Sequence, residues 1–191
     1  GCIIYPAAEV VAPGVVKLIS GDKYLLGEPD GSRSPRGLRI SEAMIAAGLR
    51  APLRRDFRDE LWVKLLGNLS LNPVCALTGL TLAGAIEEPT IAAIIRTMMT
   101  EAETVGRELG INFKASIEQR MEGARAVGYH RPSMLQDLER GRPLEIEALL
   151  GAVVELGGWV ERPMPLCQTI LALIRARDRS RSSGKCSKTG R

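Results

Sequence analysis

The pattern of hydrophobic and polar positions changes near Asp56. Before this residue, short apolar runs bounded by turn-forming residues predict three strands, at residues 2–5, 15–19 and 24–26. The segment Ser20-Gly21-Asp22-Lys23 predicts a hairpin or meander that joins the last two of these strands. A short helix over residues 38–47, ended by Gly48, follows them. These few strands lack a complete sheet to join.

After Asp56 the apolar residues recur at helical spacing. The clearest stripe runs from Pro89 to Leu109 and stops at Gly110, and Pro73 is expected to bend or end an earlier helix. Six helices are predicted, at residues 57–73, 89–109, 114–126, 133–139, 144–156 and 165–176. The chain is therefore expected to be mostly α, with an all-helical domain over residues 57–176 joined to the remnant of a mixed domain over residues 1–56.

Composition is that of a foldable globular chain, with 191 residues of which 45% are hydrophobic and 25% charged. The net charge of +4 is local, because residues 175–191 hold seven Lys or Arg and one acidic residue. The remaining 174 residues carry 19 basic and 21 acidic groups, so a basic groove for nucleic acid is not expected. Residues 177–191 are polar and low in complexity, which predicts a basic, disordered tail.

Cysteine and histidine offer few metal ligands, since the four cysteines are far apart and His130 is the single histidine. Reduced thiols in a cytoplasmic protein are the simplest interpretation. No apolar run approaches the roughly 18 residues that a membrane span needs, so no membrane association is expected. The chain begins at Gly1 without a methionine or a signal sequence, which indicates the inside of a longer protein.

The segment around Lys64 combines a cation and two amides on one side of an otherwise apolar helix. Lys64, Asn68 and Asn72 are spaced by four residues, which places them on one face. A lysine on a helix usually faces solvent, but two asparagines in register with it favour hydrogen bonding to something in a cleft. Gly67 costs helix stability and is typical of a place where another group approaches closely.

A second polar segment lies around Ser133 and Glu145. Ser133 and Gln136 match a capping box, although a serine at a helix start could also bind a substrate carboxylate. Glu145 falls in an expected first helical turn, where an acidic residue is favourable without any function. Both readings stay open from the residues alone.

Together these segments resemble the C-terminal domain of the ketopantoate reductase (2-dehydropantoate 2-reductase) family. The resemblance rests on Trp62-x-Lys64, Asn68 and Asn72-Pro73, on Ser133-Met134-Leu135-Gln136-Asp137, and on Glu145 twelve residues after the serine. Upstream, Tyr5-x-Ala7-Ala8, Pro13-Gly14-Val15-Val16 and Leu26-Gly27-Glu28 resemble the last strands of the family's N-terminal domain. The likeness covers nearly the whole chain except its tail.

The resemblance implies a fold, a cofactor and a set of site residues. The family joins a Rossmann-type NADPH domain to a helical domain and binds a small 2-oxo acid between them. It implies that residues 1–56 are the end of the NADPH domain, whose glycine-rich loop is absent from this chain. It also implies that the activity is reduction of ketopantoate to pantoate in pantothenate biosynthesis, with a homo-oligomer as a possible assembly. This fragment alone is expected to be inactive.

The same resemblance assigns roles to individual residues. Lys64 corresponds to the catalytic lysine, Glu145 would hold Lys64 or a substrate hydroxyl in place, and Asn68 and Ser133 would bind substrate. Asn72 would join them or only cap the bend before Pro73.

Two departures from the family's pattern bear on the substrate. His130 stands where the family often has an asparagine, and residues 81–84 lack an asparagine that some members use. The open alternatives are a related reductase of another 2-oxo acid and a non-catalytic helical interaction or dimerisation module.

Overall fold

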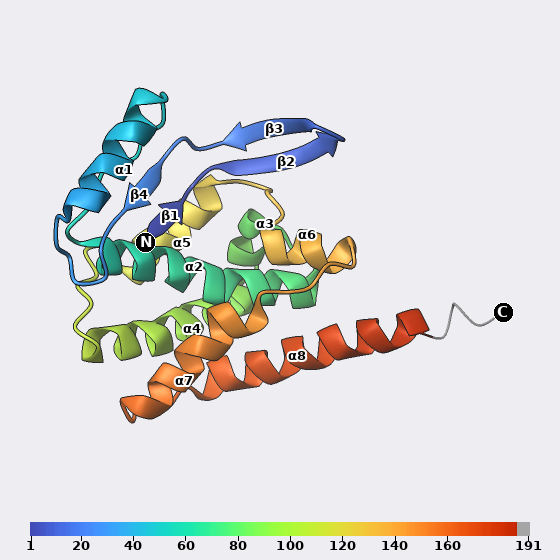
Figure 1. Cartoon of the computed structure of the whole chain (residues 1–191). Coiled ribbons are helices and arrows are strands. Elements are labelled where there is room, and N and C mark those ends of the chain that lie inside the picture. The colour runs from blue at the N-terminus through green and yellow to red at the C-terminus, as the bar shows by residue number, and fades with distance from the viewer. Residues whose placement is uncertain (187–191) are drawn as a thin grey trace. The chain divides into compact units, whose positions relative to one another are not determined.

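The computed structural model describes residues 1–186 (Figure 1). The chain divides into two compact units, Gly1–Trp62 and Val63–Arg191. The division falls within the helix α2 (Phe57–Thr78) rather than at its start. The first unit holds all the strands, and the second consists of helices and their connections. This mostly α fold, with short strands before the helices, is the expected one.

The strands of the first unit form two antiparallel pairs. In sequence order they are β1 (Cys2–Ile4), β2 (Ala7–Ala12), β3 (Val15–Ser20) and β4 (Tyr24–Leu26), and β1 pairs with β4 while β2 pairs with β3. The β2–β3 hairpin turns at Gly14, whose φ of 76° favours glycine.

The expected hairpin through residues 20–23 is therefore wrong. The turn at Gly14 lets β3 pair with the nearer strand β2, so residues 20–23 only connect strands of different pairs. The prediction did not recognise β2 as the partner of β3, because it placed the hairpin turn at residues 20–23 instead of at Gly14.

A helix and a further extended segment complete the first unit. The helix α1 (Pro35–Ala46) begins after Ser34, whose hydroxyl accepts from the Gly37 amide, and it ends before Gly48, as expected. After α1, parallel bridges pair Lys23 with Arg50 and Leu26 with Leu53. A strand, a helix and a parallel neighbour in this order form a crossover connection, the unit from which α/β sheets are built.

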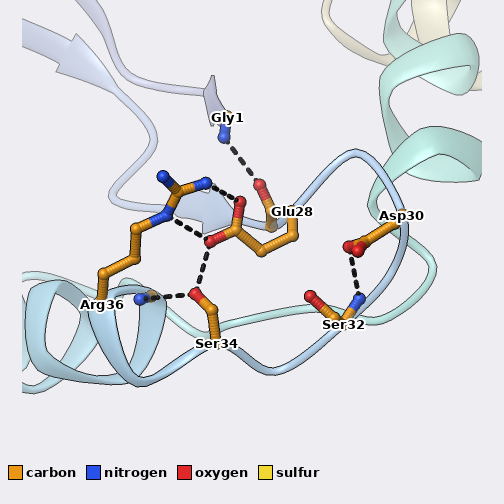
Figure 2. A network of polar contacts seen from close by, with 8 residues as sticks. Gly1, Glu28, Asp30, Ser32, Ser34 and Arg36 are labelled. Atoms are coloured by element: carbon orange, nitrogen blue, oxygen red, sulfur yellow. Dashed lines mark hydrogen bonds and ion pairs between the residues drawn. The ribbon is translucent and has the colours of Figure 1, made fainter.

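A polar network joins the loop after β4 to the start of α1 (Figure 2). The Arg36 guanidinium donates to both carboxylate oxygens of Glu28, at 2.8 and 2.7 Å, and the Ser34 hydroxyl donates to the same carboxylate. These bonds, first that of Arg36 and then that of Ser34, lower the pKa of Glu28 to about 2. Glu28 is therefore ionised at neutral pH and holds the loop to the helix.

The second unit is built around one long helix, α4 (Pro89–Glu108). Its elements after α2 are α3 (Leu82–Glu87), α4, α5 (Ile117–Ala126), α6 (Ser133–Glu139), the π-helix η1 (Glu147–Gly151), α7 (Ala152–Trp159) and α8 (Pro165–Cys186). The helix α4 contacts α3, α5, α7 and α8, so its apolar stripe is the centre of this unit. None of the described helices combines the length and apolar character needed to cross a bilayer.

Two helices extend further than the sequence predicts. Every residue of α2 from Leu69 to Ala76 is buried, and the helix continues past Pro73 to Thr78. Proline removes one backbone donor, but enclosure on all sides keeps the helix in place. The helix α8 reaches residue 186, so residues 177–186 are helical rather than disordered, and the rest of the expected tail lies outside the described residues.

The start of α8 is held by a side chain from α4. The Glu101 carboxylate accepts from the backbone amides of Leu166 at 3.0 Å and Cys167 at 2.9 Å. These amides belong to the first turn of α8, where backbone donors have no partner within the helix. A distant acidic residue thus caps α8 and fixes it against α4.

Candidate active site

The polar face of α2 is the core of the candidate site. Lys64 and Asn68 are half-buried and Asn72 is 6% exposed, and because all three lie in one helix at intervals of four they share a face. Gly67 is three residues after Lys64 and belongs to the same side. The predicted arrangement of a cation and two amides on α2 is present in the fold.

Asn72 is the most enclosed of these polar residues. Its side chain makes no hydrogen bond to another described residue, although buried amides normally have partners. Its amide atoms are also not among the fully enclosed polar atoms of the described residues. The amide therefore keeps a small accessible area and an unused hydrogen-bonding capacity.

No protein group approaches Gly67, contrary to the expectation of close approach. A Cβ built at Gly67 meets no atom within 4 Å, so there is open space beside this face of the helix. If a group does approach Gly67 closely, it does not come from the described part of this chain.

Ser133 is not a helix cap in the structure. The N-cap of α6 is Pro132, which makes no side-chain capping bond, and Ser133 is the first helical residue. The Gln136 side chain instead donates to the Arg131 carbonyl at 2.8 Å. The predicted capping box is therefore wrong, and the exposed Ser133 hydroxyl has no bond to another described residue.

His130 and Glu145 come from two other connections. His130 is half-buried in the segment between α5 and α6, and its carbonyl accepts from the Leu82 amide at 3.0 Å. Glu145 is exposed just before η1, and its carbonyl accepts from the Leu149 amide at 3.2 Å. No ion pair joins the Glu145 carboxylate to a described residue.

A neighbouring glutamate, which also lies in the predicted helix start, is engaged elsewhere. The Glu147 carboxylate pairs with Arg175 of α8, at 2.7 Å from Nε, and this bond lowers its pKa. Glu147 also lies over Gly151, where an added Cβ would stand 2.5 Å from its Oε2 atom. Of the two glutamates, Glu145 is thus the one whose carboxylate is left available. Sequence spacing gives no signal for the ion pair, since its partners are 28 residues apart.

Among the described residues, the two buried cysteines have thiols with raised pKa values. Burial raises the pKa of the Cys75 thiol to about 11, and burial, with Glu101 as a further cause, raises that of Cys167. Both thiols are protonated at neutral pH. Within the described part, no three His, Cys, Asp or Glu side chains are grouped so that they could hold a metal ion.

Comparison with protein families gives one match over most of the second unit. The model described as "Ketopantoate reductase PanE/ApbA C terminal" matches residues 56–178, a range that includes every residue of the candidate site. The match therefore covers more than half of the chain.

Individual proteins extend this similarity to the first unit. The chain is 51% identical to a 2-dehydropantoate 2-reductase of Mesorhizobium japonicum over 175 residues, which are 92% of this chain and 54% of that protein. It also resembles the crystal structure of a candidate ketopantoate reductase from Ralstonia solanacearum MolK2, with a TM-score of 0.89, 35% identity and coverage of 95% of this chain and 56% of the other. The chain thus spans about half the length of the relatives that it matches.

The fold also occurs in an enzyme with a different name. A structure of D-mandelate dehydrogenase with NADH and anilino(oxo)acetate matches with a TM-score of 0.80 at 21% identity, over 93% of this chain and 59% of the other. At this identity the likeness concerns the fold alone.

Proposed function

The chain belongs to the ketopantoate reductase family, and on that basis we propose that it forms the substrate-side half of an NADPH-dependent 2-oxo-acid reductase. The proposed reaction is reduction of 2-dehydropantoate (ketopantoate) to pantoate, a step of pantothenate biosynthesis. The observation that carries the proposal is the polar face of α2, Lys64 with Asn68 and Asn72, within the matched range. The cytoplasm is the proposed location, and the unpaired thiols of Cys2, Cys75 and Cys167 support a reducing compartment.

Lys64 is the proposed proton donor. When hydride from the nicotinamide nucleotide reaches the carbonyl carbon of a 2-oxo acid, negative charge develops on the carbonyl oxygen. An ammonium group next to that oxygen stabilises the charge and can supply the proton. Lysine suits both tasks, because arginine does not release a proton near neutral pH.

The two asparagines are proposed to bind and orient the substrate. An amide both donates and accepts hydrogen bonds, so Asn68 and Asn72 can hold the oxygens of a 2-oxo acid beside Lys64. This role is supported by the open space at Gly67 and by the Asn72 amide, which has no hydrogen-bond partner among the described residues.

Ser133, His130 and Glu145 are proposed to complete the site from other elements. The uncommitted hydroxyl of Ser133 can donate to the substrate carboxylate. Glu145 can hold the Lys64 ammonium or a substrate hydroxyl, because its carboxylate has no other described partner. His130 would contact the substrate, and its difference from the family's asparagine favours a second candidate, reduction of a related 2-oxo acid.

The nucleotide is proposed to be held by a segment that this chain does not contain. The sequence has no G-x-G-x-x-G loop, and none of the residues of the first unit is assigned to the phosphates. The residues of this chain are therefore proposed to bind the substrate, to supply the proton and to stabilise the negative charge on the carbonyl oxygen.

Replacement of Lys64 tests the proposal. In a protein that includes the nucleotide-binding segment, Lys64→Ala should lower kcat for ketopantoate about a hundredfold or more, as loss of a charge-stabilising donor does. NADPH affinity should not change, and Lys114→Ala, at an exposed lysine in the same unit, is the control. Turnover should be followed by NADPH oxidation with ketopantoate and with several other 2-oxo acids.

The outcomes distinguish a ketopantoate reductase from a reductase of another 2-oxo acid and from a non-catalytic module. Unchanged turnover in Lys64→Ala would show that Lys64 is not the proton donor. No turnover of any 2-oxo acid by the wild type would leave a non-catalytic helical module as the better description. A higher kcat/KM for a different 2-oxo acid would keep the site and replace the substrate.

A further inference from the structure

A cavity of about 550 Å³ lies within the second unit, away from Lys64. It is lined by the last turn of α2, by α6 and by the second half of α8. The nearest lining residue of α2, Ala76, is twelve residues beyond Lys64, which is about 18 Å along the helix axis. The volume is within the range of small-molecule sites. The cavity is thus distinct from the proposed reaction centre.

Two arginines of α8 give the cavity an excess of positive charge. Arg177 is exposed, and its guanidinium makes no ion pair or hydrogen bond with another described residue. Arg181 is only 20% exposed, and its Nη2 atom donates to Asp178 and to the Arg142 carbonyl. The Nε and Nη1 atoms of Arg181 are enclosed and have no acceptor in the described part of the chain. Enclosed donors without an acceptor cost free energy, so a movement of the Arg181 side chain that brings these donors to a ligand oxygen in the cavity would be favourable.

The remaining charges at the cavity favour a single negative charge on the ligand. Glu139 also lines the cavity, but it pairs with Arg131. With two arginines and one glutamate, the lining has a net charge of +1. A dianion such as phosphate would meet repulsion from Glu139 and Asp178, whereas a carboxylate would not exceed the available charge.

Part of the cavity lining is apolar. Ala76 and Leu77 of α2 face the same space as Leu135 and Leu138 of α6. Apolar side chains beside a small number of polar groups are typical of sites that orient a small molecule. A ligand with a short hydrocarbon body would cover these side chains and remove them from water.

We propose that this cavity binds a small organic monocarboxylate, with its carboxylate at Arg177 and Arg181 and its hydrocarbon body on Leu77, Leu135 and Leu138. The site goes beyond the proposed reductase function and does not depend on it. Hexanoate is a suitable probe because it has one carboxylate and a five-carbon apolar body.

The test is calorimetric titration of hexanoate into the full chain at physiological salt. A dissociation constant on the order of 1 mM or below is expected for a ligand of this size. Acetate, which lacks the apolar body, and inorganic phosphate, which lacks the body and is mostly dianionic, should each bind at least tenfold more weakly. Equal binding of all three would overturn the proposal, because it would show unspecific attraction of anions.

Variants locate the binding. Arg177→Glu and Arg181→Met should each weaken hexanoate binding at least tenfold, whereas Arg179→Glu, an exposed residue of the same helix outside the lining, should not. Arg177 is exposed, so its replacement decides the result if Arg181→Met lowers the melting temperature too far. Equal weakening by Arg179→Glu, or no hexanoate binding at all, would overturn the proposal.

Lys64→Ala separates the two sites. Hexanoate binding should persist in this variant, since the proposed carboxylate site is at the other end of α2. Loss of binding in Lys64→Ala would show that hexanoate enters the reaction centre instead, and it would overturn the second site while leaving the reductase proposal intact.

Discussion

At the scale of single residues, Gly67 places helix stability and ligand binding in opposition. A glycine inside a helix is less stable than alanine by up to about 1 kcal/mol, and at Gly67 no neighbouring protein atom would obstruct a methyl group. Packing therefore does not require a glycine here. A substrate lying against the Lys64 face would require it.

Gly67→Ala is expected to raise the free energy of unfolding by up to about 1 kcal/mol while weakening substrate binding. In the complete reductase, KM for the 2-oxo acid should rise about tenfold or more, because displacement of a bound substrate by even 1 Å is costly. Chemical denaturation and steady-state kinetics give the two quantities. Greater stability with an unchanged KM would mean that no ligand lies at this glycine.

Glu28 predicts how the first unit responds to acid. Its pKa of about 2 is lower than the ordinary value of 4.5, so its bonds to Arg36 and Ser34 stabilise the fold fully above pH 4.5. This contribution is lost as pH falls from about 4.5 towards 2. In Glu28→Gln the unfolding free energy should therefore fall less steeply over this window, as measured by denaturation at a series of pH values. Parallel curves for the variant and the wild type would contradict the assignment.

The candidate site was readable from the sequence only where it follows helical periodicity. Lys64, Asn68 and Asn72 could be placed on one face because their spacing alone fixes it. The role of Ser133 as a cap could not, because Pro132 takes the N-cap position and Gln136 turns to the Arg131 carbonyl. Such choices depend on local backbone angles that residue types do not determine.

At the scale of elements, helices with a clear apolar stripe were predicted well and those defined by tertiary contacts were not. The helix α4 matches its prediction within one residue, since Pro89 and Gly110 mark its ends. The continuation of α2 beyond Pro73 and of α8 beyond residue 176 depends on packing and pairing with distant residues. The strand β2 was not predicted, because its pairing with β3 depends on the turn between them and not on the hydrophobic pattern of β2.

The π-helix η1 provides a test of how Glu147, Gly151 and Arg175 are coupled. Alanine at position 151 should stabilise a helix by about 1 kcal/mol, but its methyl group would displace the Glu147 carboxylate from Arg175. The pair is 66% and 41% exposed, so its loss costs only about 0.2–1 kcal/mol.

We therefore expect Gly151→Ala to be nearly neutral in the wild type and stabilising by about 1 kcal/mol in a Glu147→Ala background. Thermal or denaturant unfolding of the four proteins of this cycle measures the difference. Equal effects of Gly151→Ala in both backgrounds would show that the ion pair and the glycine are independent.

At the scale of the whole molecule, we propose that the chain supplies only part of what the reduction of a 2-oxo acid requires. Residues 56–178 match the family's C-terminal domain, while the chain as a whole covers 54% of the Mesorhizobium japonicum relative. We propose that the parallel crossover of the first unit belongs to the end of a nucleotide-binding sheet whose phosphate loop is not in this sequence. Substrate contacts are thus proposed to be present and nucleotide contacts to be incomplete.

Residues 1–191 alone are expected to bind NADPH more weakly than micromolar and to show no turnover with ketopantoate. Calorimetry with NADPH and an absorbance assay at saturating ketopantoate measure these two properties. A protein of the family's full length, prepared in parallel, is the positive control. Micromolar affinity for NADPH in the 191-residue chain would show that its first unit holds the nucleotide without a glycine-rich loop.

The cap that Glu101 places on α8 has a consequence for the order of assembly. The amides of Leu166 and Cys167 have their acceptor 65 and 66 residues earlier in the chain, so we expect the first turn of α8 to become stable only after α4 has formed. During synthesis Glu101, which carries the acceptor, leaves the ribosome before the two residues whose amides donate to it. These two amides should accordingly become protected from hydrogen exchange only after those of α4, which makes α8 a late-folding segment.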